Sequence, residues 1–252
     1  MPKHDLTIDP ALMNAAGSLG FSPDLHSPID WSRLGAFVTN PVSLTARTPA
    51  RGRRFIEFPG GFLLHTGYPN PGITRVVRHY AKHWHHSPVP VLVHLLAGSA
   101  EELRMMTRRL EMVEGVSGLE VGVDSDTSVE LVKALTQAAC GEYPVIVRLP
   151  MERAVELATE AMNSGATAIS LAPPRGRYPT GNGELVKGRM YGPAILPVAL
   201  RAVHELYQMS IPVIGAGGVY AQEQAAAILA EGALAVQLDS IFWCRAGYSV
   251  FA

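Results

Sequence analysis

Short apolar runs rich in Val, Ile and Leu alternate along the chain with longer segments of helical period. This alternation is typical of repeated βα units, in which crossover helices cover a parallel sheet. Eight apolar runs predict strands that begin near Leu12, Ala36, Val89, Gly118, Pro144, Ala168, Pro212 and Ala235. Between them we expect helices over 73–85, 101–114, 129–139, 152–164, 194–208 and 222–231. Eight strands with crossover helices favour an α/β fold closed as a (β/α)8 TIM barrel.

Two interruptions of this pattern, at about 45–68 and 173–191, are dense in Gly, Pro and Arg. Each follows a predicted strand, so we expect long βα loops on the face of the barrel where binding sites are built. The alternative is that both segments are surface loops without a role in a binding site. The whole chain, residues 1–252, has the length of one barrel domain. Only IFWCRAGYSVFA follows the last strand, which predicts that the final helix is short or missing.

The composition narrows the classes of partner. Hydrophobic residues make up 48% and charged residues 17% of the chain, which suits buried parallel strands. The formal net charge of -1 gives no bulk attraction to nucleic acid or to an anionic membrane. The N-terminus lacks the apolar stretch of a signal peptide, and two cysteines are too few for a disulfide framework. We therefore expect a cytoplasmic protein with a small-molecule substrate, no nucleic acid and no membrane as partner.

The segment IPVIGAGGV runs from an apolar strand into glycines and then into a helix. Because Gly217 and Gly218 lack side chains, backbone N–H groups there can approach an anion, and the helix N-terminus adds favourable partial charge. The next strand ends in Asp239 and Ser240, and barrels often hold phosphate with the loops after strands seven and eight. Ser240 offers a hydroxyl donor, whereas the Asp239 carboxylate repels phosphate unless it turns away. These residues predict a phosphate-bearing ligand; a tight turn that needs glycine is the alternative.

A family resemblance extends this prediction. The segments NAAGSLG, GAFVTNPVSLTAR, YPNPG, YGPAILPVALRAVHEL, IPVIGAGGV and EGALAVQLDS stand in the order found in dihydroorotate dehydrogenases, the FMN-dependent barrel enzymes of pyrimidine synthesis. The chain resembles this family over nearly its whole length. The resemblance implies FMN as the cofactor and a flavin-dependent oxidoreductase activity. Family precedents include homodimers and assemblies with an electron-transfer subunit, so a homodimer is one expectation.

The resemblance also implies roles for individual residues. Ala15, Ala16 and Gly17 would lie against the flavin ring. Arg148 takes the place of a family lysine that stabilises negative charge on the reduced ring, with the same charge and a different geometry. Asn40 stands where the family has a lysine that contacts flavin and substrate. The residues implied around the ribityl phosphate are Gly192, Gly217, Gly218, Asp239 and Ser240.

The substrate half of the implied site departs from the family pattern. Leu64 replaces an asparagine, and residues 172–173 read Ala-Pro in place of an Asn-Ser or Asn-Thr pair. A motif like NxSCPN places the family's asparagine on Glu120 and its catalytic base on Val123, and valine cannot remove a proton. Each lost hydrogen-bond donor is worth on the order of 1–3 kcal/mol. These losses predict that orotate specificity is gone and that true dihydroorotate dehydrogenase activity is doubtful.

Other side chains could supply the missing chemistry. His65 is an acid/base candidate, and Asp124 and Ser125 sit beside the vacated base position. His94 is expected to be structural. The histidines of 79–86 fit a solvated helix surface, and no metal site is expected. Three basic residues of the second long interruption could steer an anionic substrate: Arg175, Arg177 and Lys187.

Three functions remain open on these grounds. The first is an FMN-dependent oxidoreductase with a changed substrate, in which Arg148 supports the reduced flavin. The second is a barrel that binds FMN or another phosphate without turnover, as an accessory or regulatory subunit. The third is a non-redox barrel enzyme that acts on a phosphorylated metabolite and uses Arg148 and Glu120 for catalysis.

Overall fold

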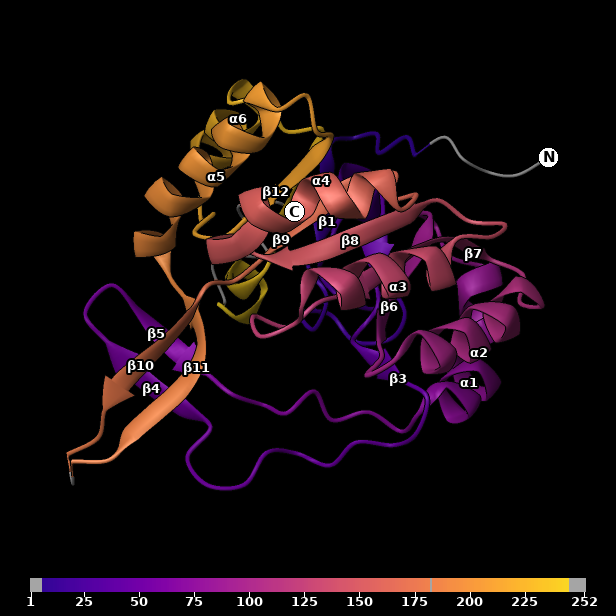
Figure 1. Ribbon diagram of the computed structural model, residues 1–252, viewed down its shortest axis with the longest axis horizontal. Helices are drawn as coiled ribbons and strands as arrows, with labels where there is room; N and C mark the ends of the chain where they lie inside the picture. Colours follow the sequence, from indigo (N-terminus) through magenta and orange to yellow (C-terminus); the bar gives the residue numbers. More distant parts are fainter. Residues whose placement is uncertain (1–5, 182, 245–252) are drawn as a thin grey trace.

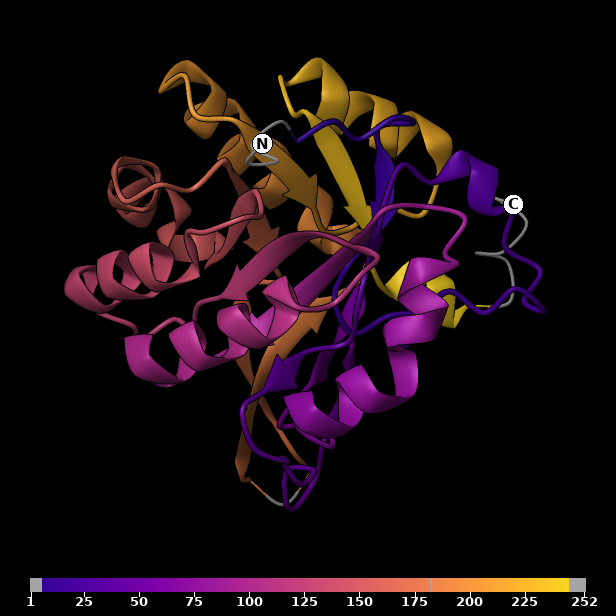
Figure 2. The same ribbon diagram turned by 90° about the vertical axis from the view of Figure 1, so that its right-hand side faces the viewer.

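The computed structural model describes residues 6–181 and 183–244, and it confirms the predicted barrel (Figures 1 and 2). Neighbouring strands pair in parallel in the order β1-β13-β12-β9-β8-β7-β6-β2, and the short β3 also pairs with β6. Each of the eight predicted strands corresponds to one position in this order. The strands are β1 (Leu12–Asn14), β2 (Phe37–Val38), β3 (Val42–Ser43), β6 (Val91–Leu96), β7 (Val116–Gly122), β8 (Val145–Pro150), β9 (Ala168–Ala172), β12 (Val213–Ala216) and β13 (Ala235–Leu238).

Asn14 closes the barrel between its first and second strands. Only one bridge, Met13 to Ala36, joins β1 to this part of the chain among the described residues. The buried Asn14 side chain takes the place of further ladder bonds, since its Oδ1 accepts from the N–H of Val38 at 2.8 Å and its Nδ2 donates to the carbonyl of Val38 at 2.7 Å. A side-chain amide carries the same donor and acceptor as a peptide group, so it can continue the ladder.

Helices surround the strands, as Figure 2 shows. Their apolar faces bury side chains such as Trp84, Leu103 and Met106 against the outer side of the sheet, where the larger core lies. Ser99 caps the helix that follows it, with the side chain accepting from the N–H of Glu102. The helices are α1 (Ile73–His85), α2 (Ala100–Glu111), α3 (Val129–Ala139), α4 (Ala154–Asn163), α5 (Leu196–Gln208) and α6 (Gln222–Ala230), with 3-10 turns η1 (Trp31–Arg33), η2 (Met151–Arg153), η3 (Pro193–Ile195) and η4 (Ser240–Trp243).

The end of the barrel agrees with the sequence only in part. After β13 the described chain forms the 3-10 turn η4 and ends at Cys244, and the rest of the predicted short or missing helix lies outside the described residues. None of the described helices is long and apolar enough to cross a membrane.

The two long interruptions form a second sheet instead of staying irregular. The first contains β4 (Phe55–Phe58) and β5 (Gly61–Leu64), the second β10 (Arg175–Pro179) and β11 (Leu185–Tyr191). Both hairpins are antiparallel, and β5 pairs with β11 to join them in the order β10-β11-β5-β4. Figure 1 shows this sheet projecting from one end of the barrel. The partners in the β5–β11 ladder are more than 100 residues apart in sequence, for example Leu64 with Arg189, so local patterns do not reveal it.

The barrel interior has two chemically different layers. The layer nearer the amino ends of the strands is apolar and includes Met13, Val38 and Ile214. In four strands the residue two positions beyond an interior apolar side chain is polar, which follows from the alternation of side chains along a strand. The four apolar-to-polar steps are Leu92 to His94, Ile146 to Arg148, Ala168 to Ser170 and Ala235 to Gln237.

Glu120 lies at the centre of the polar layer and is fully buried. Its carboxylate accepts from His94 Nδ1 at 2.5 Å, from Ser170 Oγ at 2.7 Å and from Gln237 Nε2 at 2.6 Å. Arg148 Nη1 lies 3.8 Å from the same group. Burial alone would raise the pKa of Glu120, but the hydrogen bond from His94 and the charge of Arg148 outweigh it and lower this pKa to about 2. Burial lowers the pKa of His94, so we assign a neutral imidazole that donates to an ionised Glu120.

Substituting Glu120 by Gln tests this network through acid stability. A carboxyl with a lowered folded-state pKa contributes stability that is present above its unfolded pKa of 4.5 and is lost as the pH falls toward about 2. The shift corresponds to about 3 kcal/mol. We expect Glu120→Gln to lower the free energy of unfolding by about that amount at pH 7, measured by urea denaturation, with the difference shrinking between pH 4.5 and pH 2.

Glu223→Gln, which changes an exposed carboxylate, is the matched control and should change stability by less than about 0.5 kcal/mol. A Glu120→Gln variant as stable as the parent at pH 7 would contradict the network.

Candidate functional site

A cavity of about 160 Å³ opens at the carboxyl ends of the barrel strands. Four of the predicted cofactor residues line it together, namely Ala16, Gly17, Asn40 and Arg148. They come from segments at the ends of β1, β2 and β8, which meet on the face where barrels build their sites. We refer to this space as the mouth cavity.

The loop after β1 has a fixed shape at the mouth cavity. Ala15 is buried, and its N–H donates to the carbonyl of Leu238 at 2.7 Å. Gly17 has φ +92°, a conformation that favours glycine. Asn40 holds the far end of the loop, because its Oδ1 accepts from the N–H of Gly20 at 3.2 Å and its own N–H donates to the carbonyl of Gly20 at 2.6 Å. A lysine at position 40 could not accept the first of these bonds.

Arg148 is the cation of the mouth cavity that the sequence predicts. It lies on β8, two residues before the end of the strand, with only 7% of its surface exposed, and one end of its guanidinium faces Glu120. Its Nε is buried and has no hydrogen-bond partner within the described part of the chain. Buried polar atoms are rarely left without a partner, so this donor points to a group that binds in the cavity.

A second buried arginine, Arg189, lines the same cavity and was not predicted. It lies on β11, its guanidinium carbon sits 3.9 Å from the centre of the Tyr68 ring, and its Nη2 donates to Thr66 Oγ1 at 3.4 Å. Tyr191 on the same strand is also buried, and burial raises the pKa of its hydroxyl. Tyr191 begins the quoted YGPAIL segment and Arg189 stands two residues before it. This proximity was the available sequence indication.

Aromatic side chains form one wall of the mouth cavity. The Phe62 and Tyr191 rings stack at 5.4 Å, and Trp243 meets the Tyr191 ring edge-on at 5.3 Å. Trp243 is 43% exposed, which leaves a large apolar surface beside the cavity. A flat aromatic ligand is the kind of group that such side chains stack against.

The predicted phosphate glycines lie where two chain segments meet. Gly217 and Gly218 follow β12 with φ +108° and +76°, and Gly192 precedes η3 with φ +131°. A Cβ atom on Gly218 would stand 2.3 Å from the backbone nitrogen of Leu196, at the start of α5. The backbone turn after β12 therefore packs directly on the beginning of the η3 and α5 segment, a contact that only glycine allows.

The Asp239 side chain is hydrogen-bonded to the next residue, Ser240. One Asp239 carboxyl oxygen accepts from the Ser240 N–H and, at 2.8 Å, from its hydroxyl, while the Tyr220 hydroxyl lies 2.7 Å from Ser240 Oγ. Burial raises the pKa of Asp239, against the opposing effect of its hydrogen bonds with Ser240. The hydrogen-bond donors of Ser240 are directed to Asp239 in this arrangement, so donation to a phosphate requires them to turn.

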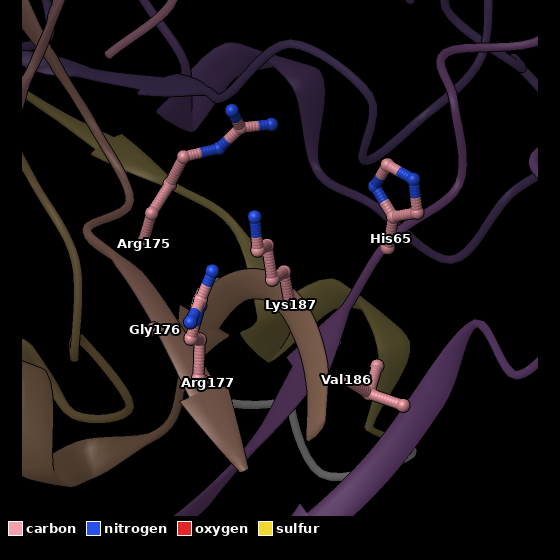
Figure 3. Close-up of a pocket in the computed structure, with 7 residues that line it drawn as sticks. His65, Arg175, Gly176, Arg177, Val186 and Lys187 are labelled. Atoms are coloured by element: carbon pink, nitrogen blue, oxygen red, sulfur yellow. The ribbon is translucent and has the colours of Figure 1, made fainter. Parts of the chain in front are cut away.

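The predicted catalytic side chains other than Arg148 do not line the mouth cavity. His65 lines a separate cavity of about 500 Å³ together with Arg175, Arg177 and Lys187 (Figure 3). Asp124 reaches toward Arg175, with 3.8 Å between the carboxylate and the guanidinium. The Ser125 hydroxyl donates to the Glu152 carboxylate at 2.9 Å.

Two expectations about the strand-four motif are wrong. Glu120 was expected at the position of the family's asparagine in the substrate half of the site, but it is fully buried within the barrel and hydrogen-bonded to side chains of three other strands. Val123 was expected at the position of a catalytic base, but it packs in the outer core beneath the helices. The interior residue that follows Glu120 along β7 is Gly122, since side chains alternate between the two faces of a strand.

No group of three or more His, Cys, Asp or Glu side chains suitable for a metal ion occurs among residues 6–181 and 183–244.

Comparison with known proteins places this chain in a family. A family model described as dihydroorotate dehydrogenase matches residues 4–251. The chain is 29% identical over 274 residues to the "Dihydroorotate dehydrogenase B (NAD(+)), catalytic subunit" of Geotalea uraniireducens (strain Rf4), with 95% of this chain and 88% of the relative covered. It is 30% identical over 259 residues to the protein of the same name from Desulforudis audaxviator (strain MP104C), with 93% and 83% covered. The chain belongs to the dihydroorotate dehydrogenase family.

Proposed function

We propose that this chain is an FMN-dependent oxidoreductase of the dihydroorotate dehydrogenase type whose substrate is not dihydroorotate. The observation that carries the proposal is the mouth cavity, where Ala16, Gly17, Asn40 and the buried Arg148 meet. The relatives are named as catalytic subunits, so we also expect this chain to pass its electrons to a second protein. A homodimer remains an expectation from family precedent.

The described residues fit FMN at its phosphate end and at its ring end. At one end, the close packing of Gly218 on the nitrogen of Leu196 brings the turn after β12 against the start of α5, so backbone N–H groups of both segments are available to hold a phosphate beside this contact. At the other end, two features suit a flat polar ring. They are the Nε of Arg148, which has no partner among the described residues, and the aromatic wall of Tyr191 and Trp243. When bound, FMN would supply the two-electron redox chemistry that no side chain provides.

Arg148 would stabilise negative charge at the ring. Its guanidinium is held between Glu120 on one side and the mouth cavity on the other. Glu120 offsets part of its charge and fixes its position, while the Nε donor stays available to a ligand. A positive charge already in place costs no reorganisation when negative charge develops beside it.

The proposal of a different substrate rests on which residues of β7 face the barrel interior. With Glu120 committed to the barrel core, the family's asparagine corresponds to Gly122 and its base, three residues later, to Ser125. A side chain at position 122 would stand 2.7 Å from the Nε2 atom of His94, so the imidazole occupies the space that a substrate-binding amide would need. On this assignment Ser125 keeps the base, while the substrate-binding amide of the family is replaced by Gly122.

Ser125 could act as the base with the help of its neighbour. Its hydroxyl donates to Glu152, so this carboxylate can take the hydroxyl proton as the Ser125 oxygen accepts a proton from a substrate carbon. Asp124 is the second candidate on the same loop. Arg189 supplies a cation at the mouth cavity in place of the lysine that Asn40 replaces, which suits a substrate with a carboxylate or another anionic group.

The purified protein should contain FMN. We expect flavin absorbance in the visible spectrum, about one cofactor per chain after denaturation, and FMN as the released species by mass spectrometry. A colourless protein that FMN cannot reconstitute would count against the cofactor and favour a non-redox barrel.

Arg148→Met should lower the midpoint potential of the bound flavin, because the reduced ring loses a stabilising positive charge. A tenfold change in the equilibrium constant of a two-electron couple corresponds to about 30 mV, and we expect a shift of at least that size. Arg148→Lys, which keeps the charge, should restore most of the potential. Equal potentials in Arg148→Met and the parent, at equal FMN content, would rule out this role.

Dihydroorotate should not reduce the bound flavin. Anaerobic mixing of the FMN-loaded protein with millimolar dihydroorotate is expected to leave the visible flavin absorbance unchanged, whereas dithionite should bleach it. Rapid bleaching by dihydroorotate would show that the losses at Asn40, Leu64 and Gly122 do not remove orotate specificity. Failure of dithionite to bleach would point to a fault in loading rather than in specificity.

A further inference from the structure

The second sheet carries an unusual row of positive charges. In the β10–β11 ladder Arg175 stands opposite Arg189, and Arg177 stands opposite Lys187. Residues two apart on a strand share a face, so all four cations lie on the same side of this hairpin. Like charges directly opposite one another destabilise a sheet, and here two such pairs follow in succession.

Few negative charges offset this row. Within the described part of the chain, Asp124 is the one carboxylate that the structure places within 4 Å of Arg175, Arg177, Lys187 or Arg189, at 3.8 Å from Arg175. Arg189 is instead stacked on the Tyr68 ring. The face therefore has a net positive charge, and an anion that binds over this face of the two paired strands would relieve the repulsion.

The row borders a cavity of suitable size. His65, Arg175, Arg177 and Lys187 line the space of about 500 Å³, and Figure 3 shows the Arg175 and Lys187 side chains extending to the same side of the sheet, with His65 across from them. Desolvation and the nearby charges of Arg175 and Arg189 lower the pKa of His65. The imidazole therefore lies within the electrostatic field of these cations. Arg189 also lines the mouth cavity, which makes the two spaces neighbours along one row of cations.

We propose that this cavity binds a phosphoryl group, carried by the end of a small-molecule substrate that lies away from the flavin. A phosphate monoester has a charge of about -1.5 to -2 at pH 7 and three acceptor oxygens, so it can bind donors that arrive from different directions. A single carboxylate has one charge and two oxygens in a plane, which matches one arginine better than a row. Binding of the phosphoryl group stands on the geometry of the sheet alone, and its place in the substrate rests on the proposed function.

The test uses the full chain, isolated with whatever FMN it holds, and inorganic pyrophosphate as the probe. Histidine labelled with 15N, with the His65 signals assigned through His65→Gln, reports the ring by NMR, and calorimetry gives the dissociation constant. We expect the His65 ring signals to shift on titration at constant pH, with saturation at millimolar pyrophosphate or below.

Paired variants identify the residues responsible. Arg177→Gln with Lys187→Gln should weaken pyrophosphate binding at least tenfold, since both side chains are exposed and their loss should not disturb the fold. The matched control, Arg104→Gln with Lys133→Gln, removes the same charge from exposed positions on α2 and α3 and should leave the dissociation constant within twofold. Equal weakening by the two double variants, or no shift of the His65 signals, would overturn the proposal.

FMN content, measured on the same preparation, separates this proposal from the proposed function. A protein without FMN whose His65 signals still respond keeps the phosphoryl site and loses the flavin function. A flavin-loaded protein whose His65 signals do not respond does the reverse. Succinate, added as a dicarboxylate probe, should bind at least tenfold more weakly than pyrophosphate, and tighter binding of succinate would contradict the phosphoryl group.

Discussion

The buried carboxylate of Glu120 is the constraint on which the arrangement of this barrel depends. An ionised carboxylate in a protein interior is costly unless it is paired and hydrogen-bonded. Here the compensation comes from side chains on four other strands, which are His94 on β6, Arg148 on β8, Ser170 on β9 and Gln237 on β13. These strands must keep their register for the carboxylate to stay satisfied. The same interaction fixes Arg148 at the mouth of the barrel, so a requirement of the core also positions a residue of the site.

The charges around the mouth follow from this arrangement. Glu120 offsets part of the charge of Arg148 from inside the barrel. Arg189 on β11 stacks on an aromatic ring, and no carboxylate lies close to it among the described residues. The second sheet continues the positive face outward through Arg175, Arg177 and Lys187. A cofactor or substrate with several negative charges would thus meet one continuous electrostatic environment, from the polar layer of the barrel to the projecting hairpin.

The sequence predicts the barrel better than it predicts the site. Alternating apolar runs and helical segments are local patterns, and each predicted strand has its counterpart in the structure. A strand buried on both faces shows no polar alternation, so the sequence did not indicate which residues of β7 face the barrel interior. The motif comparison placed the family's asparagine and base on Glu120 and Val123, whereas the structure has Glu120 inside the barrel and Val123 in the outer core. The β5–β11 ladder joins segments that no local pattern connects, so the second sheet was read as two loops.

The two halves of the site differ in how they depend on sequence. The turn of Gly217 and Gly218 is set by backbone conformation, and a short motif is enough to specify it. The polar groups of the other half come from distant segments, and a function lost at one position can be supplied from another. Asn40 lacks the ammonium that the family has there, yet Arg189 brings a guanidinium to the same cavity from β11, 149 positions further along the chain. A motif comparison records the first change as a loss and overlooks the second. Under the proposed function, the substrate half keeps a positive charge while its shape changes, and this combination argues for a different anionic substrate rather than for an inactive site.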